Sequence, residues 1–182
     1  KTKKQYVFSV LNYKKSINIA LCPGSRVQEV ERHMPVLCEF IKKYHPINNQ
    51  TINFFIVRAP DVEESLLEKH MKNLNAYIVD QPVLEVFQKC HFGIVASGTA
   101  SLESAITTRP LVVIYKMSWL SWYITQKFIK IPFACIVNIL ANKKIVPELL
   151  QADFNVQNLA ATLNDFFNKN SQKDYKNNIE EV

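Results

Sequence analysis

The sequence predicts a doubly wound α/β fold on a parallel sheet of about six strands. Short apolar runs alternate with amphipathic stretches along the 182 residues. These runs lack the alternating polarity of half-exposed strands, as expected of strands that are buried on both faces. Two of the three glycines, Gly24 and Gly98, lie just after such runs, where a doubly wound chain turns tightly from strand to helix.

The elements follow one another in the order that this fold requires. We expect strands at residues 17–22, 52–57, 76–79, 92–96, 111–115 and 133–137. We expect helices at 26–44, 62–74, 82–89, 100–107, 119–129 and 155–167, and one helical turn at 147–150. The first helix places an apolar residue at every third or fourth position. Asn155 is a suitable cap for the last one.

The segment 92–115 organises the prediction, because it contains strand, tight turn, helix and strand in immediate succession. Ligands of doubly wound folds bind outside the carboxyl ends of the strands. There, the first N–H groups of a helix are available to anions. Residues 97–103 are therefore predicted to hold a phosphorylated ligand.

Composition narrows the class of protein. The net charge is +6, but residues 1–15 hold five lysines, and the remaining 17 basic and 16 acidic residues nearly balance. This argues against a nucleic-acid-binding surface. The four cysteines are far apart without a CxxC pair, which favours reduced thiols in the cytoplasm and no metal site. No apolar run approaches the about 18 residues of a membrane span, and no signal peptide is recognisable.

The chain is predicted to hold one domain. Residues 17–168 form this domain, residues 1–16 a linker or the tail of a preceding segment, and residues 169–182 a frayed C-terminal tail.

Arg26 is the first candidate for ligand binding. Ser25 and Gln28 fit a capping box, which would place Arg26 at the first helical position. The helix dipole disfavours a cation there, unless an anion such as phosphate lies beside it. The alternative is an ordinary surface arginine.

Glu103 and Asn138 are the other candidates. Glu103 lies one turn into its helix, where its two oxygens could accept hydrogen bonds from a ribose diol, or could simply favour the helix dipole. Asn138 follows a predicted strand and could bind a polar ligand edge or serve a turn. Walker loops, dinucleotide fingerprints and nucleophile elbows are not found in the sequence. The residues alone therefore indicate a nucleotide- or phosphate-binding α/β domain.

A membrane-facing surface is predicted on the helix at 119–129. On a helical wheel, Trp119, Tyr123, Lys127 and Lys130 share one sector. Aromatic rings with lysines are typical of helices at a lipid interface. The alternative is that Trp119 and Trp122 pack in the core and that the lysines are merely solvated.

Five segments together resemble the lipid-A-disaccharide synthases, glycosyltransferases of the two-domain GT-B architecture. They are LCPGSR with the following QEVE (21–31), ASGTASLE (96–103), RPLVVIYK (109–116), NILA (138–141) and VPELLQ (146–151). The resemblance extends over residues 17–167. It departs from the family pattern at Val137, where proline is usual, and at Asn142, where glycine is common.

The resemblance implies that this chain is the C-terminal, UDP-donor-binding half of such an enzyme. The reaction would transfer 2,3-diacylglucosamine from its UDP donor to 2,3-diacylglucosamine 1-phosphate, with inversion to a β-1,6 linkage, release of UDP, and neither metal nor cofactor. The acceptor site and catalytic residues would belong to an N-terminal domain, so the chain alone should be inactive. It would act in the cytoplasm, peripherally at the inner face of the inner membrane.

The resemblance also implies roles for individual residues. Arg26 would bind the diphosphate, Glu103 the ribose, and Asn138 the donor beside the interdomain cleft. Two turns would complete the donor site. The first contains Gly24 and Ser25. The second contains Ser97, Gly98 and Thr99, whose backbone N–H groups would contact the diphosphate. Two other functions remain open: a non-catalytic nucleotide or phosphate sensor, and another UDP-sugar GT-B relative such as an epimerase.

Overall fold

The computed structural model describes residues 16–45, 51–119, 122–123, 133–167 and 175. Its centre is a six-stranded sheet in the order β3-β2-β1-β4-β5-β6, with every pairing parallel. The strands are β1 (Ser16–Cys22), β2 (Thr51–Val57), β3 (Ala76–Val79), β4 (Phe92–Ala96), β5 (Leu111–Tyr115) and β6 (Glu148–Leu150). The predicted doubly wound parallel sheet is therefore confirmed.

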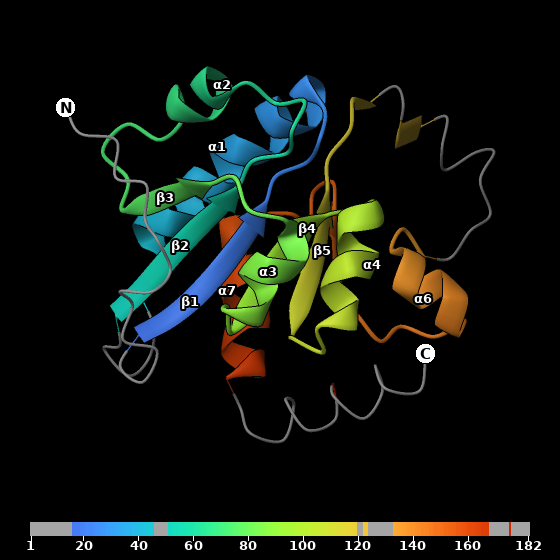
Figure 1. Ribbon diagram of the computed structural model, residues 1–182. Helices are drawn as coiled ribbons and strands as arrows, with labels where there is room; N and C mark the ends of the chain where they lie inside the picture. The colour runs from blue at the N-terminus through green and yellow to red at the C-terminus, as the bar shows by residue number, and fades with distance from the viewer. Residues whose placement is uncertain (1–15, 46–50, 120–121, 124–132, 168–174, 176–182) are drawn as a thin grey trace.

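Helices cover both faces of this sheet (Figure 1). The helices are α1 (Val27–Lys43), α2 (Glu64–Glu68), α3 (Val83–Gln88), α4 (Thr99–Ile106), α6 (Ile136–Ala141) and α7 (Val156–Phe166). On one face α1 packs against α2 and α7, and on the other α3 packs against α4 and β1. Because β1, β4 and β5 lie between these layers, their side chains are almost all buried. This explains their continuous apolar sequences.

The prediction of the sixth strand is wrong. The strand predicted at 133–137 is not formed, and its last two residues begin α6 (Ile136–Ala141). The strand at the sheet edge is instead β6, within the segment 147–150 where a helical turn was predicted. β6 pairs with β5. Its Glu148 carboxylate accepts the N–H groups of Ala134 and Cys135 at 2.8 and 3.0 Å. The strand thus caps the start of α6, an arrangement that depends on tertiary contacts and not on local periodicity.

Three helix predictions have mixed outcomes. Asn155 caps α7 as predicted, accepting the Asn158 N–H at 2.9 Å. The helix predicted at 62–74 is confined to α2. Of the helix predicted at 119–129, only residues 119, 122 and 123 are described, and these are helical. The predicted tails lie outside the described residues except for Ser16, which begins β1, and Tyr175, which packs against Phe166.

Two buried asparagines connect β1 with β2. Asn18 and Asn53 face each other in the register of the two strands. The Asn53 amide donates to the Asn18 side-chain oxygen at 2.9 Å and to the Ser16 hydroxyl at 3.1 Å. Asn18 in turn donates to the Lys89 carbonyl. These buried amides therefore have partners, as burial of polar groups requires.

Candidate functional site

A cavity of about 670 Å³ lies at the carboxyl edge of the sheet. Its walls are the segments that follow β1, β2, β3 and β4, together with the first turn of α4. Seven of the eight residues predicted to bind the donor line it: Gly24, Ser25, Arg26, Ser97, Gly98, Thr99 and Glu103. The structure thus brings together two turns that are more than 70 residues apart in the sequence.

The turn before α4 presents unused backbone donors to this cavity. Gly98 has a φ of 154° and precedes the helix without a side-chain cap. No acceptor for the Gly98 and Thr99 N–H groups is found among the described residues. The Ser97 N–H differs from the prediction, because it donates to the Ile114 carbonyl at 2.9 Å and its hydroxyl to the Ala134 carbonyl. Among the N–H groups of this turn, those of Gly98 and Thr99 thus remain available for an anion as far as the described residues go.

The turn before α1 is held by Glu29. Gly24 has a φ of 125°, and a Cβ there would lie 2.6 Å from the Glu29 carboxylate, so the position requires glycine. The predicted capping box is absent: the helix begins after Arg26, and Glu29 accepts the Ser25 N–H at 3.2 Å. Glu29 also pairs with Arg26 at 3.2 Å. The Arg26 guanidinium thus already lies beside an anionic group of the chain, the Glu29 carboxylate. Its contact with a diphosphate stays a prediction.

Glu103 is the acid of the cavity without a partner. It is exposed on α4 and lines the cavity, and no ion pair or hydrogen bond joins its carboxylate to another described residue. Its charge also acts on Cys22, another residue that lines the cavity. Burial in the first place and the Glu103 charge in the second raise the pKa of the Cys22 thiol to about 12. A carboxylate with free oxygens at the cavity wall can accept two hydrogen bonds from a ligand.

Arg58 and Asp80 complete the charged lining, and the sequence analysis missed both. They follow β2 and β3, and Arg58 Nε donates to Asp80 Oδ1 at 2.6 Å and its guanidinium to the Val62 carbonyl at 2.9 Å. Each is the first residue after its strand. The positional argument that singled out the turns after β1 and β4 would have found them too.

Asn138 is the predicted site residue that the structure does not bring to the cavity. It is fully buried on α6. Its amide donates to the Val146 carbonyl and to Glu148, and its oxygen accepts the N–H groups of Ile145 and Val146, all at 2.7–2.8 Å. These four bonds use the whole capacity of an amide. In contrast to the prediction, the side chain has no free group for a ligand.

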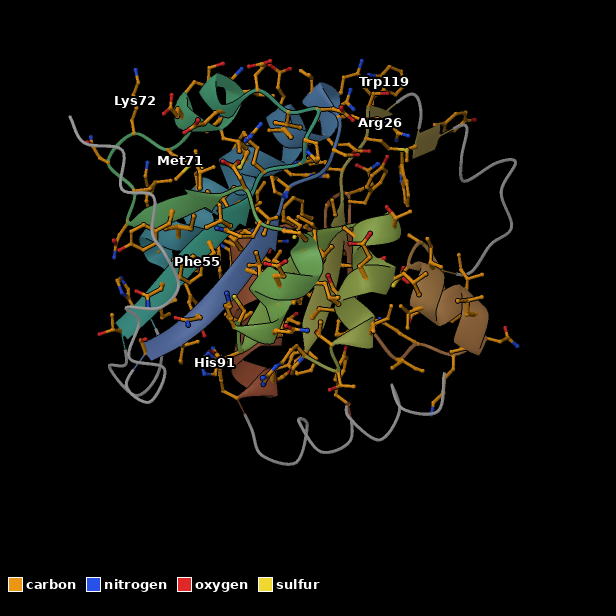
Figure 2. All side chains as sticks on the ribbon, viewed as in Figure 1. Arg26, Phe55, Met71, Lys72, His91 and Trp119 are labelled. Carbon is orange, nitrogen blue, oxygen red and sulfur yellow. The ribbon has the colours of Figure 1, made fainter. Side chains whose placement is uncertain are left out.

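The predicted membrane surface is exposed where it is described. The side chains of Trp119 and Tyr123 are 80% and 60% exposed, so the alternative that Trp119 packs in the core is wrong. Figure 2 shows Trp119 and Arg26 at the same end of the molecule. Lys127 and Lys130 lie outside the described residues. Within the described part of the chain, no helix has the length and apolar composition needed to cross a bilayer.

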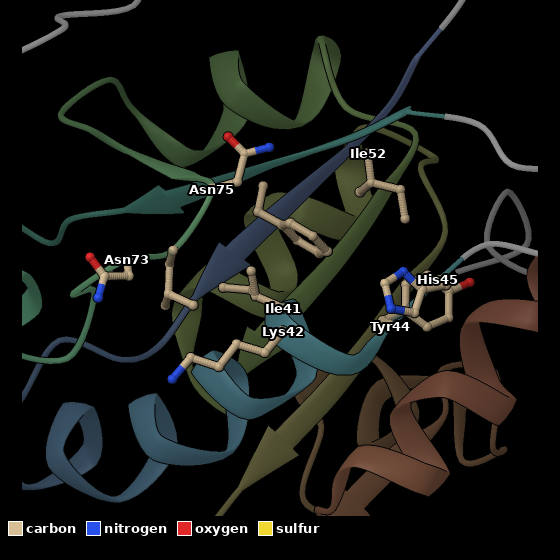
Figure 3. Close-up of a pocket in the computed structure, with 9 residues that line it drawn as sticks. Ile41, Lys42, Tyr44, His45, Ile52, Asn73 and Asn75 are labelled. Atoms are coloured by element: carbon tan, nitrogen blue, oxygen red, sulfur yellow. The ribbon is translucent and has the colours of Figure 1, made fainter.

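Other features do not resemble a second active site. A smaller pocket of about 390 Å³ lies at the opposite edge of the sheet, between the end of α1, β2 and the segment before β3 (Figure 3). It contains none of the predicted site residues. Among the described residues, no three or more His, Cys, Asp or Glu side chains gather in a way that could hold a metal ion. All four cysteines are buried free thiols.

Comparisons with known sequences agree on one family. A family model described as lipid-A-disaccharide synthetase matches residues 2–182. Lipid-A-disaccharide synthase 1 of Legionella pneumophila (strain Philadelphia 1) is 37% identical over 156 residues, which are 85% of this chain and 40% of the relative. The synthase of Anaeromyxobacter sp. (strain K) is 37% identical over 149 residues, 79% of this chain and 38% of the relative. The chain thus spans about 40% of the length of these relatives.

Comparisons with solved structures bear on the fold. The N-terminal domain of trehalose-6-phosphate phosphatase from Candida albicans has a TM-score of 0.60 at 13% identity, covering 93% of this chain and 38% of that one. The catalytic domain of cholesterol-α-glucosyltransferase from Helicobacter pylori has a TM-score of 0.51 at 14% identity, covering 91% of this chain and 99% of that one. At such identities the likeness shows only the fold, that of GT-B glycosyltransferases.

The four hydrogen bonds of Asn138 generate a stability prediction. Asn138→Ala should lower the free energy of unfolding by about 2–4 kcal/mol, because it leaves the N–H and the carbonyl of the buried Val146 without their partner. Denaturant unfolding measures this. The matched control is Asn155→Ala, which removes an N-cap and should cost about 1 kcal/mol. Equal losses in the two variants would contradict the structural role of Asn138.

Proposed function

Because the chain belongs to the lipid-A-disaccharide synthetase family, we propose that it is the UDP-donor-binding part of a lipid-A-disaccharide synthase. In this proposal the cavity at the carboxyl edge binds UDP-2,3-diacylglucosamine. The rest of the enzyme, which the relatives have in the remaining part of their length, provides the acceptor site.

One observation supports this assignment above the others. The Glu103 carboxylate lies one turn along α4 from the N–H groups of Gly98 and Thr99, and none of these groups has a partner among the described residues. Donors that suit a diphosphate thus adjoin an acceptor that suits the ribose diol. A site for inorganic phosphate alone would gain nothing from an exposed carboxylate, because it repels the anion. A site that combines N–H donors for an anion with a carboxylate that accepts hydrogen bonds from hydroxyl groups therefore favours a nucleoside diphosphate.

The proposed reaction is a displacement at the anomeric carbon of the donor. The 6-hydroxyl oxygen of 2,3-diacylglucosamine 1-phosphate bonds to this carbon, and the bond from the carbon to the diphosphate oxygen breaks. The electron pair leaves with UDP, and the hydroxyl proton passes to a base outside this chain. Attack from the face opposite the leaving group gives inversion. The first-turn N–H groups of α4 and the Arg26 guanidinium would stabilise the charge that develops on UDP.

The first test concerns the diphosphate. Arg26→Ala should weaken UDP binding by about 1.5–3 kcal/mol, roughly 10- to 150-fold, the range for hydrogen bonds to charged groups. Isothermal titration calorimetry of parent and variant measures it, and thermal unfolding verifies that both are folded. Lys42→Ala, on the last turn of α1 and away from the cavity, should bind as the parent does. A parent that does not bind UDP would refute the proposed function, and equal affinities would refute the role of Arg26.

The second test concerns the ribose. Glu103→Gln should weaken UDP binding about 10-fold, yet leave the affinity for inorganic pyrophosphate unchanged or higher, because the carboxylate is expected to contact only the sugar. Competition titrations with the two ligands distinguish these effects. Glu85→Gln, in the first turn of α3, is the matched control. A similar loss of affinity for both ligands would show instead that Glu103 supports the turn itself.

The third test concerns the membrane. We propose that Trp119 and Tyr123 insert at a lipid interface beside the donor site, because both rings are exposed and the proposed substrates carry acyl chains. The chain should cosediment with vesicles that contain anionic lipid, less so at high salt. Trp119→Ser/Tyr123→Ser should reduce the bound fraction several-fold.

The control for this test uses apolar residues on another surface. Ile106 and Leu140 are 70% and 64% exposed on α4 and α6, so Ile106→Ser/Leu140→Ser removes comparable apolar area. It should leave the bound fraction unchanged. The lipid-contact role of Trp119 and Tyr123 is excluded if the parent stays in the supernatant or if both double variants lose binding equally.

A further inference from the structure

We propose that His33 is a positioning residue for the diphosphate: it fixes the turn of residues 23–25 relative to the end of β5. This inference rests on the proposed function, because it assumes that this turn holds part of UDP. His33 lies on α1 and does not line the cavity. Its effect on a ligand must therefore pass through the backbone that it holds.

The hydrogen bonds of His33 define its protonation state. Its Nε2 accepts the backbone N–H of Lys116 at 2.9 Å, which requires a lone pair on that nitrogen. The proton is therefore on Nδ1, which donates to the Pro23 carbonyl at 2.6 Å. One neutral imidazole thus joins the segment after β1 to the segment after β5.

The surroundings of the ring stabilise this neutral form. His33 is fully buried, with the rings of Tyr115 and Phe154 packed edge-on at centroid distances of 5.8 and 5.6 Å. Burial lowers the pKa of His33, the more so with Arg32 and Lys116 nearby, while the Pro23 carbonyl and Glu29 oppose this shift. At neutral pH the ring can therefore keep both bonds.

The strand order explains why such a bridge is needed. β4 lies between β1 and β5, so no sheet hydrogen bond fixes the segments after β1 and β5 relative to each other. Pro23 directly precedes Gly24, which has a positive φ of 125°. Because glycine lacks a Cβ, the backbone at this position could adopt several other turn conformations. Glu29, one helical turn before His33, holds the same turn, because its carboxylate accepts the Ser25 N–H at 3.2 Å. Two residues of α1 therefore hold the turn in one conformation before an anion binds. Binding then does not have to include the entropic cost of ordering this turn.

The test compares ligands with and without the diphosphate. His33→Leu fills the space of the ring but makes neither bond, and it should weaken UDP binding about 10-fold while uridine binding stays within about twofold. His33→Asn can restore the bond to Pro23 and His33→Gln the bond to Lys116, so each should recover part of the loss. Calorimetry gives the UDP affinities, and NMR titration gives the weaker uridine affinities.

The matched control is another histidine that binds a backbone amide. His91 Nδ1 accepts the Asn18 N–H at 3.0 Å, just before β4 at the edge of the sheet away from the cavity. His91→Leu should lower the unfolding temperature without changing the preference for UDP over uridine. If His33→Leu is folded and binds UDP as the parent does, or loses both ligands equally, the positioning role is wrong. If the parent binds no UDP, the proposed function has failed instead.

A second measurement needs no variant and decides the question if His33→Leu does not fold. Nitrogen NMR of the parent at neutral pH should show His33 protonated on Nδ1 and unprotonated on Nε2. UDP, but not uridine, should shift the Nδ1–H and Lys116 amide resonances, because the diphosphate contacts the turn that they hold. A doubly protonated ring, or resonances that UDP leaves unmoved, would overturn the inference.

Discussion

The pairing of β1 with β4 is the constraint on which the site depends. The register places Cys22 beside Val95, so both strands end at nearly the same level. The backbone that follows β1 and the backbone that follows β4 then diverge, because α1 and α4 pack on opposite faces of the sheet. Two diverging backbones cannot close the space above the strand ends, and the cavity occupies that space. The free N–H groups of the α4 turn and the carboxylate of Glu103 face it because of this divergence.

Charge alone would not select a ligand here. Both arginines of the cavity are paired with carboxylates, Arg26 with Glu29 and Arg58 with Asp80. Such pairs reduce the general attraction for anions, and they hold each guanidinium in one orientation. Recognition would therefore rest on directed hydrogen bonds more than on net positive potential. Under the proposed function, such a site would bind a nucleoside diphosphate and still discriminate against the many other phosphorylated metabolites of a cell.

The sequence predicted what is decided locally. The central strands and both glycine turns were located correctly, because continuous apolar runs and turn residues identify them without knowledge of the rest of the chain. β6 was missed because it has three residues, and its pairing with β5 and the capping of α6 by Glu148 depend on distant contacts. His33 was missed for a similar reason, because its place depends on two backbone groups that are 93 residues apart in the chain. Arg58 was missed although its position directly after β2 could have identified it.

The buried amides of Asn18 and Asn53 have a consequence for how the chain avoids misfolding. Parallel strands composed almost entirely of aliphatic and aromatic residues could pair in several registers with little difference in energy. In this sheet, a shift of β2 along β1 by two residues would separate the two amides, so that their mutual hydrogen bond is lost and one of them faces an apolar residue, Phe55 or Ala20. The two asparagines therefore favour the observed strand register, because they raise the free energy of sheets in which β2 is shifted along β1.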